Sequence, residues 1–362
     1  KENDTSLKVL PPLLENIVSI AKNMKLILLS ATPMFDNPTE IIFLINLLLR
    51  NDNKPILNVK DIFDKNYNFV EKDGIQIGKE LLLYKTRGYI SYMRGENPLA
   101  FPLRLDADKS VLIKRSNYPK KMINGDDISE EKRLKYLNII NCEMRDHQKN
   151  IYNKMEETKF GAFDLPGMIT SNIVYPFNDN QDNINEYENL VGTSGFNNTF
   201  SKKSGVYSIK PNVKNMDFLD IDKIGNYSSK MEKILKFIDN SKGIIFVYSQ
   251  FIWGGLVPLA LALEYNGYSK YDGSIFNGEK KSSKKIITED GTFDAKYVII
   301  SGDKELSKNT YENYIKIESE NKNGEKVKVI LGSETAAEGL DFKYIREVHI
   351  LYPWHHLNKT EQ

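Results

Sequence analysis

"VKVILGSETAAEGLDF", residues 327–342, joins a short apolar run to a loop of small side chains, hydroxyls and acids. The apolar run predicts a strand, and the loop after it contains two glycines and two adjacent alanines. Large side chains are absent from this turn, so we expect another molecule to approach its backbone closely. The stretch therefore predicts a binding loop at the end of a sheet strand.

The composition is that of an ordinary globular protein. The chain has 362 residues, which is enough for about two domains, with 40% hydrophobic and 27% charged residues. The formal net charge is +1, so there is no global basic signature, and any nucleic-acid surface must be a local patch.

The cysteine content and the apolar runs indicate the compartment. Cys142 is the only cysteine, which excludes an internal disulfide and favours a reducing compartment. The few histidines show no zinc spacing, so no metal site is expected. The longest apolar runs are too short to span a bilayer, and we expect no membrane association. The N-terminus has neither an initiating Met nor a signal-peptide pattern, so the chain looks like a piece of a longer protein.

Helix, strand, loop and helix alternate in the first part of the chain. A helical pattern leads into "KLILL", residues 25–29, which predicts a short buried strand. After the turn "SATPMFDN", a helix is predicted with Asn37 as N-cap, Pro38 at its first position and Glu40 completing a capping box. This order is typical of a parallel α/β sheet.

The middle of the chain loses this rhythm. Residues 129–159 predict one long helix or two, and residues 177–205, rich in Asn and Gly, predict a flexible loop. This region is interpreted as an insertion or bridge between two sheet domains.

The alternation returns towards the C-terminus. A helix is predicted from Ser228 or Ser229, a buried strand at "GIIFVYSQF", a helix ended by Gly267, and a hairpin before "YVIIS". Further strands are predicted at "KVKVIL" and "EVHILYP". Strands joined through helices predict an α/β fold with a parallel sheet and ligands at the C-terminal strand ends.

Four motifs in order give a family resemblance. "SAT" after an apolar strand resembles motif III of superfamily-two helicases and translocases, "GIIFVYSQF" motif IV and "GSETAAEGLDF" motif V. "VHILYPWHHLNKTEQ" resembles the approach to motif VI, whose first Gln would be Gln362. The pattern is similar to the Swi/Snf-type branch. The resemblance is closer still to the helicase-like ATPases of large cytoplasmic DNA viruses. Known members of that group are the small subunit of the poxvirus early transcription factor and the poxvirus nucleoside-triphosphate phosphohydrolase. One departure is Gly-Leu-Asp at residues 339–341, where Swi/Snf proteins usually have Gly-Leu-Asn.

The resemblance implies a domain organisation. Residues 1–105 would be the C-terminal part of a first RecA-like domain, residues 106–225 a helical and Asn-rich bridging insertion, and residues 226–362 a second RecA-like domain truncated at motif VI. The fold class it implies is α/β, with RecA-like parallel sheets flanked by helices.

The resemblance also implies roles for individual residues. Motif III would couple the nucleotide site to the nucleic-acid groove, through Ser30, Ala31 and Thr32. Nucleotide binding would involve Gly339 and Asp341, with Asp341 accepting from the ribose or holding a motif VI arginine. Backbone and hydroxyl groups would bind nucleic-acid phosphates, at Ser249, Gln250, Gly332, Ser333 and Thr335.

Several alternatives stay open. Ser249 and Gln250 are equally suited to capping the end of their strand, and Glu338 to capping a following helix. The whole motif V loop could be a tightly packed helix N-terminus. Trp354 could stack on a base, although packing within the domain is the favoured interpretation.

Two lysine-containing patterns do not indicate a site. "GSIFNGEKKS", residues 273–282, resembles a phosphate loop, but Glu279 stands where the essential Lys belongs. "KKSSKK", residues 280–285, is interpreted as a solvated turn, with contact to a nucleic-acid backbone as the alternative.

The catalytic elements of ATP hydrolysis are absent from the sequence. It contains no Gly-x-x-x-x-Gly-Lys-Ser/Thr and no Asp-Glu dipeptide, and the motif VI arginines would follow Gln362. The chain is therefore interpreted as the central segment of a longer translocase that uses ATP and Mg²⁺. No catalytic residue is expected within it, and the segment alone should be inactive.

The leading functional hypothesis is an ATP-dependent helicase or translocase of viral transcription. Its partners would be nucleic acid, more readily DNA than RNA, and viral RNA polymerase or transcription-factor subunits, in the host cytoplasm or the virion. The alternatives are a non-catalytic RecA-like binding or docking subunit, and an α/β domain whose motifs are coincidental.

Overall fold

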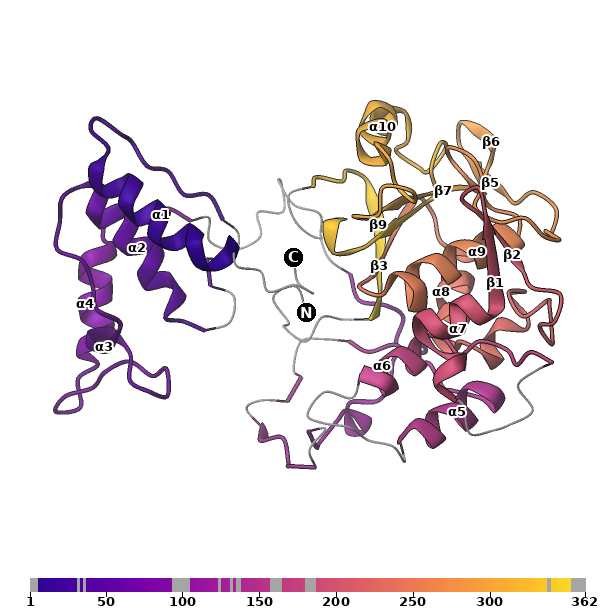
Figure 1. The fold of residues 1–362 in the computed structure, drawn as a ribbon, viewed down its shortest axis with the longest axis horizontal. Coiled ribbons are helices and arrows are strands. Elements are labelled where there is room, and N and C mark those ends of the chain that lie inside the picture. Colours follow the sequence, from indigo (N-terminus) through magenta and orange to yellow (C-terminus); the bar gives the residue numbers. More distant parts are fainter. Residues whose placement is uncertain are drawn as a thin grey trace. The chain divides into compact units, whose positions relative to one another are not determined.

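The computed structural model describes residues 6–30, 33–34, 37–92, 105–122, 125–130, 133–134, 138–156, 165–179, 187–336 and 340–352. The chain forms two compact units, Lys1–Arg104 and Leu105–Gln362 (Figure 1). Within the described ranges, no helix has the length and apolar character needed to cross a membrane.

The first unit is helical in its described part. Its helices are α1 (Ser6–Ile20), α2 (Glu40–Asn51), α3 (Val59–Ile62) and α4 (Ile77–Thr86). One face of α2 is buried against the segment that follows it, and Asn46 of α2 bonds both the N–H and the C=O of Leu57, at 2.8 and 2.9 Å. The predicted start of α2 is two residues too early: the helix begins at Glu40, and Thr39, not Asn37, is its N-cap residue. The Asn37 side chain instead accepts from the Thr39 N–H at 3.0 Å, in the turn before the helix.

The predicted buried strand at residues 25–29 is wrong. These residues form no strand, and Ile27 and Leu29 are 68% and 92% exposed. A strand requires a neighbour for its N–H and C=O groups, and the described residues of this unit contain only isolated bridges such as Phe63↔Phe69. The apolar run therefore identified a segment suited to a sheet, but this unit offers it no described partner.

The second unit contains a five-stranded sheet in which every pair of neighbours is parallel. The strand order is β4 (Ser269–Lys270), β7 (Lys296–Ile300), β8 (Val329–Gly332), β3 (Ile244–Ser249) and β9 (Ile345–Tyr352). This sheet confirms the α/β class and the parallel arrangement.

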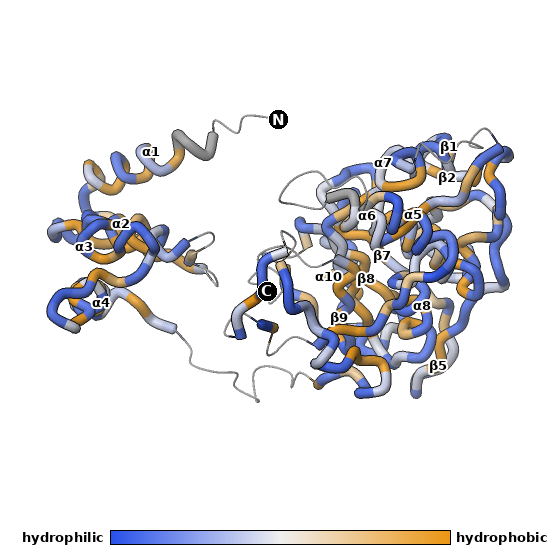
Figure 2. Tube along the Cα trace, turned by 90° about the horizontal axis from the view of Figure 1, so that it is seen from below, coloured by the Kyte–Doolittle hydropathy of each residue, from blue (hydrophilic) through white to orange (hydrophobic). Residues whose placement is uncertain are grey.

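Helices cover both faces of the sheet. Alternate residues of the strands point to opposite sides, so Ile299 and Leu331 pack with α8 (Ser229–Asn240) and α9 (Val257–Tyr265), whereas Ile330 packs with α10 (Thr310–Ile317). The strands are correspondingly apolar in Figure 2. The predicted cap of α8 is confirmed, because the Ser228 hydroxyl accepts from the Met231 N–H at 3.1 Å.

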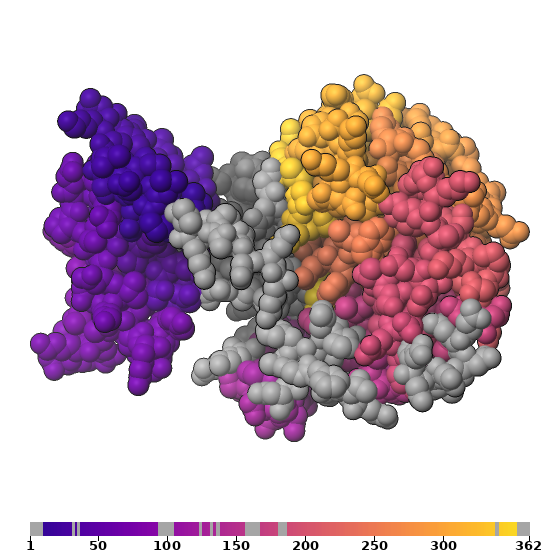
Figure 3. All heavy atoms as spheres, in the orientation of Figure 1, coloured from indigo at the N-terminus to yellow at the C-terminus, as the bar shows by residue number. Residues whose placement is uncertain are grey.

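The middle region packs against this sheet. Its described elements are α5 (Asp146–Glu156), α6 (Leu165–Asn172), α7 (Gly192–Thr199), β1 (Phe200–Lys203) and β2 (Val206–Ile209). The buried aromatic residues of α7, β1 and β2 belong to the same core as β3 and β8. Figure 3 shows the atoms of this region directly against those of the sheet segment.

Two sequence predictions for this region are wrong. The helix expected over residues 129–159 covers only α5 in the described part. The backbone of residues 139–141 pairs with residues 111–113 instead, with Ile113 N to Ile139 O at 3.0 Å. The flexible loop expected over residues 177–205 contains α7 and β1, because Phe196 and Phe200 are buried and anchor it. The predicted hairpin before β7 is confirmed as β5 (Lys285–Thr288) and β6 (Gly291–Asp294).

Candidate nucleic-acid and nucleotide site

Three strand ends lie side by side at the C-terminal edge of the sheet. Gly332, the last residue of β8, pairs with Ile300 at the end of β7 and with Tyr248 near the end of β3. The loops that follow these strands therefore begin next to one another. Motifs IV and V, which are far apart in the sequence, start at this shared edge.

The motif V loop is tied to the neighbouring strand. The Ser333 N–H donates to the Ile300 carbonyl at 3.0 Å, and the Ser333 carbonyl accepts from Ala336 at 2.8 Å, which closes a short 3-10 helix, Glu334–Ala336. Ser333 is buried, whereas Thr335 is exposed. Of the two motif V residues whose hydroxyls were assigned to phosphate binding by resemblance, only Thr335 is exposed.

Gly332 is explained by packing inside the unit. A Cβ at this position would lie 2.5 Å from the Phe246 ring and 2.9 Å from the Ala336 Cβ. No side chain fits there, whether or not a polynucleotide approaches. A role of Gly332 in nucleic-acid binding stays a prediction.

Asp341 is held by its backbone and leaves its carboxylate exposed. Its N–H donates to the Tyr311 hydroxyl of α10 at 3.2 Å. The next residue, Phe342, packs on Phe246, with ring centroids 5.5 Å apart. An exposed carboxylate on a fixed backbone can accept a hydrogen bond from a ribose hydroxyl or pair with an arginine. Residues 337–339, including Gly339, lie outside the described residues.

The motif IV strand ends in a closed turn. Ser249 is buried, and its hydroxyl donates to the Phe251 carbonyl at 3.0 Å. A Cβ on Gly255 would lie 2.2 Å from this hydroxyl, so the turn packs tightly over it. The hydroxyl of Ser249 thus serves the turn in this conformation, and half-buried Gln250 is the residue beside it that reaches the surface.

The remaining assigned residues are only partly described. Ser30 is exposed, at the end of residues 6–30. Ala31, Thr32, Trp354 and Gln362 lie outside the described residues, and their roles stay predictions.

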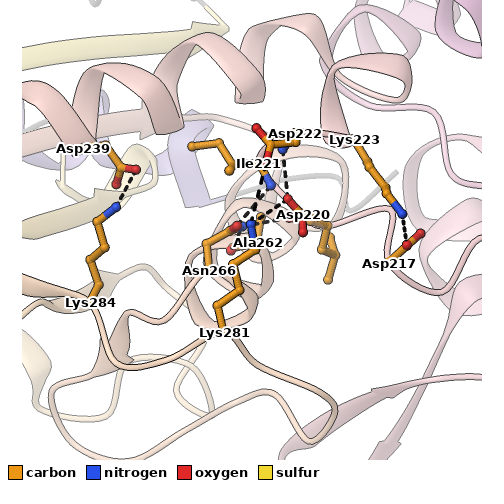
Figure 4. A network of polar contacts seen from close by, with 11 residues as sticks. Asp217, Asp220, Ile221, Asp222, Lys223, Asp239, Ala262, Asn266, Lys281 and Lys284 are labelled. Carbon is orange, nitrogen blue, oxygen red and sulfur yellow. Dashed lines mark hydrogen bonds and ion pairs between the residues drawn. The ribbon is translucent and has the colours of Figure 1, made fainter.

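The lysine run at residues 280–285 is neutralised by carboxylates. Lys281 pairs with Asp220 at 2.8 Å and Lys284 with Asp239 at 2.7 Å (Figure 4). Lys280 and Lys285 pair with Glu264 and Asp294 in the same way. The run is therefore an ion-paired turn, with little free charge for a nucleic-acid backbone.

The segment that resembles a phosphate loop surrounds an internal anion. The fully buried carboxylate of Glu264 accepts from the Ile275 N–H at 2.8 Å, the Phe276 N–H at 3.3 Å and the Tyr297 hydroxyl at 2.8 Å. Lys280 completes the set at 2.6 Å. The backbone donors that a phosphate would need are already used by this carboxylate.

Sequence reasoning missed the loop after β7. Gly302 lies against the motif V loop, since a Cβ there would be 3.2 Å from the Thr335 hydroxyl. The loop is closed by Ser307, whose hydroxyl donates to the Ser301 carbonyl at 2.6 Å. "YVIISG" has the same signal as motif V, an apolar strand followed by small residues, and could have been identified from it.

The described residues fit the expected cofactors only in part. The exposed carboxylate of Asp341 suits the edge of a nucleotide. Within the described ranges, however, no group of three or more His, Cys, Asp or Glu side chains could hold a metal ion. Mg²⁺ is therefore not assigned to any described side chain.

Comparison with known proteins identifies relatives in viruses. No family model matches the chain. It is 32% identical over 358 residues to R563 of Acanthamoeba polyphaga mimivirus, whose name describes an ATP-dependent RNA helicase; the match covers 97% of this chain and 51% of that protein. It is 27% identical over 381 residues to nucleoside triphosphatase I of Choristoneura fumiferana entomopoxvirus, with coverage of 98% and 49%. It is 24% identical over 371 residues to the termination factor NPH-I homolog of African swine fever virus, with coverage of 94% and 47%.

The chain thus spans about half the length of these three relatives. Each match runs over almost the whole of the present chain, and the all-parallel sheet places motifs IV and V at one edge. The chain is therefore related to the superfamily-two helicase-like ATPases of large DNA viruses.

Proposed function

We propose that the chain is part of an ATP-dependent motor that moves along nucleic acid during viral transcription. Its second unit would supply the nucleic-acid-binding edge and one side of the nucleotide site. The observation that carries the proposal is the alignment of β3, β7 and β8, which brings the motif IV, β7 and motif V loops together. Ligands of open parallel sheets bind at this edge.

In this proposal the described residues bind and orient. The hydroxyl of the exposed Thr335 and the backbone of its loop bond phosphate oxygens, which position a polynucleotide without reading its sequence. Asp341, fixed by Tyr311, accepts a hydrogen bond from the nucleotide ribose or holds an arginine that faces the triphosphate. ATP supplies the phosphoryl group whose transfer to water releases the energy of the cycle. DNA is the proposed polynucleotide, and RNA polymerase or transcription-factor subunits are the proposed partners.

Oligonucleotide binding by the purified chain tests the first half of the proposal. Labelled single-stranded DNA and RNA of equal length are titrated at several salt concentrations. We expect binding that weakens as salt rises, because released counterions accompany phosphate contacts, with DNA preferred. Failure to bind either polymer would refute the proposed function, and preference for RNA would reverse the choice of substrate.

Asp341→Ala tests the nucleotide half. In the polypeptide that hydrolyses ATP under nucleic-acid stimulation, this variant should lower the stimulated rate by about tenfold or more, the usual cost of removing a group that contacts the reacting nucleotide. Asp290→Ala, an exposed carboxylate in the β5–β6 turn, is the matched control and should leave the rate unchanged. Equal rates for the two variants would remove Asp341 from the site.

A non-catalytic binding or docking subunit is the second candidate. Loss of the phosphate-loop Lys or of the arginine finger from the whole viral polypeptide would favour it. Salt-dependent binding without ATP hydrolysis in the whole viral polypeptide would select this alternative.

A further inference from the structure

The β1–β2 hairpin is fixed beside the C-terminal edge of the sheet by three contacts. Lys202 forms an ion pair with Glu305 in the loop after β7. The Tyr207 ring lies 6.2 Å from the ring of Trp253, in the turn after β3. The Tyr207 backbone bonds Ile275 at 2.7 Å and Asn277 at 2.8 Å. The hairpin is therefore attached to two of the three loops that form the candidate site.

The hairpin is anchored at its base and closed by a tight turn at its tip. At its base, Phe200 and Tyr207 are buried in the core of the unit. At its tip, Ser204 and Gly205 have φ values of +51° and +80°, which form the tight two-residue turn that matches the twist of antiparallel strands. Residues 201–205, which include the tip, are all exposed, and two of them are lysines.

A second hairpin in the same unit provides a direct comparison. The β5–β6 hairpin leads into the first residue of β7, so it lies at the N-terminal edge of the sheet, and β5 and β1 are on opposite sides of the unit in Figure 2. It contains "SKKII" where the β1–β2 hairpin contains "SKKSG". Lys284 and Lys285 are both held by aspartates. Lys203 has no acidic partner among the described residues.

We propose that the β1–β2 hairpin, through Lys202 and Lys203, holds the phosphate backbone of the polynucleotide as it leaves the motif IV and β7 loops. This inference rests on the proposed function, because it assumes that the polynucleotide lies along the C-terminal edge. An ammonium group has three donors, so Lys202 can keep Glu305 and still bond a phosphate. The contact is to the backbone and is independent of base sequence.

The test compares two matched double variants of the full chain. Lys202→Ala/Lys203→Ala removes the hairpin pair, and Lys284→Ala/Lys285→Ala removes the same two charges from the opposite edge. Binding of labelled single-stranded DNA is measured by fluorescence anisotropy between about 50 and 200 mM KCl, where each lost phosphate contact lowers the log–log salt slope by about 0.7. We expect the hairpin variant to lose about 1.4 in slope, for two contacts, and roughly tenfold in affinity, and the control to bind as the unmodified chain does. Circular dichroism of both variants verifies folding.

The outcomes separate this inference from the proposed function. Equal binding by the two variants, whether reduced or unchanged, overturns the hairpin assignment. In that case, salt-dependent binding by the unmodified chain still supports the proposed motor function. Absence of binding by the unmodified chain overturns both. If the hairpin variant unfolds, Lys203→Glu against Lys285→Glu replaces the pair, and equal slopes again refute the assignment.

Discussion

We expect the free energy of unfolding of the unmodified chain to rise between about pH 7 and about pH 9.5 because of Lys230. The Lys230→Met variant should lack this rise. Lys230 lies in α8, and its ammonium donates to the Ser171 hydroxyl and the Asn172 amide oxygen, both at 2.9 Å. It also lies over the Tyr352 ring, 5.6 Å from its centroid. No carboxylate of the described residues pairs with it. Burial lowers the pKa of Lys230 from its ordinary value of 10.5 to about 8.

The sign and the size of the effect follow from these two pKa values. Between about pH 8 and pH 10.5 the unfolded chain keeps a proton that the folded chain has lost, so the free energy of unfolding rises with pH. The difference between the two pKa values of Lys230 corresponds to about 3 kcal/mol in the free energy of unfolding. About 2 kcal/mol of this appears as a gain in stability between pH 7 and pH 9.5. Part of Lys230 is exposed, and screening by water makes this value an upper limit.

Urea unfolding followed by tryptophan fluorescence measures the effect. Both tryptophans, Trp253 and Trp354, belong to the second unit, so the signal reports the unit that contains Lys230. Met keeps most of the length of the side chain without its charge. Burial raises the pKa of Tyr268, which opposes the rise at high pH, but this contribution cancels when the variant is subtracted. Burial also raises the pKa of Cys142, and the charge of Lys230 acts on that thiol, so both chains of the comparison carry Cys142→Ser. Lys233→Met on the same helix is the control. Parallel pH profiles for the unmodified chain and Lys230→Met would refute the reasoning.

Three further predictions concern the packing of the second unit. Gly332→Ala should destabilise this unit by about 1–3 kcal/mol, because the added methyl group overpacks against Phe246. Gly254→Ala is the control: its Cβ would meet ordinary contacts of 3.5 Å, and it should cost less than about 1 kcal/mol. Equal melting temperatures for the two variants would contradict this prediction. Burial lowers the pKa of His147, whose Nε2 donates to the Tyr175 carbonyl at 2.9 Å, so stability should fall as pH drops through about 6.5, where the unfolded histidine binds a proton. His147→Gln should flatten that fall, and an unchanged acid profile would exclude His147 as its cause. Glu264→Gln should cost on the order of 3 kcal/mol, because it turns an amide N–H₂ towards buried donors. Lys281→Ala, which breaks a partly exposed pair, should cost less than about 1 kcal/mol. Similar denaturation midpoints for these two variants would count against the buried network.

The sequence predicts elements well where local and tertiary preferences agree. The strands β3, β7 and β8 are largely apolar runs, as expected for a parallel sheet buried on both faces, and α8 begins after a serine that caps it. The failures have one cause. Residues 25–29 have no described partner strand, residues 139–141 have one that competes with the helix, and the Asn-rich stretch contains two phenylalanines that find a core. Each depends on a segment distant in sequence, which local periodicity does not reveal.

The sequence predicted which loops would lie next to one another, but not how the side chains of the candidate site are oriented. The order of the motifs predicted that the loops after β3 and β8 lie at the same edge of the sheet. The parallel pairing of these two strands agrees with this prediction. The direction of individual side chains was not predictable, because it depends on packing: the Ser249 hydroxyl turns inward to Phe251, and Thr335 is exposed. The same pattern of a strand followed by small residues recurs after β7, and its importance becomes visible only when Gly302 is seen against Thr335.

Charge shows this limit most clearly. "SKKSG" and "SKKII" are almost identical as sequences, yet one pair of lysines is held by aspartates and the other projects beside the candidate site with a single acidic contact. Likewise, a segment composed like a phosphate loop uses its backbone N–H groups on the carboxylate of Glu264. In both cases a negative group of the protein itself satisfies donors that could otherwise bind phosphate. Because the chain as a whole is nearly neutral, the proposed attraction for a polynucleotide would depend on which lysines lack such an internal partner. Among the described residues, Lys203 of the β1–β2 hairpin is such a lysine, and this hairpin is attached to loops at the C-terminal edge of the sheet.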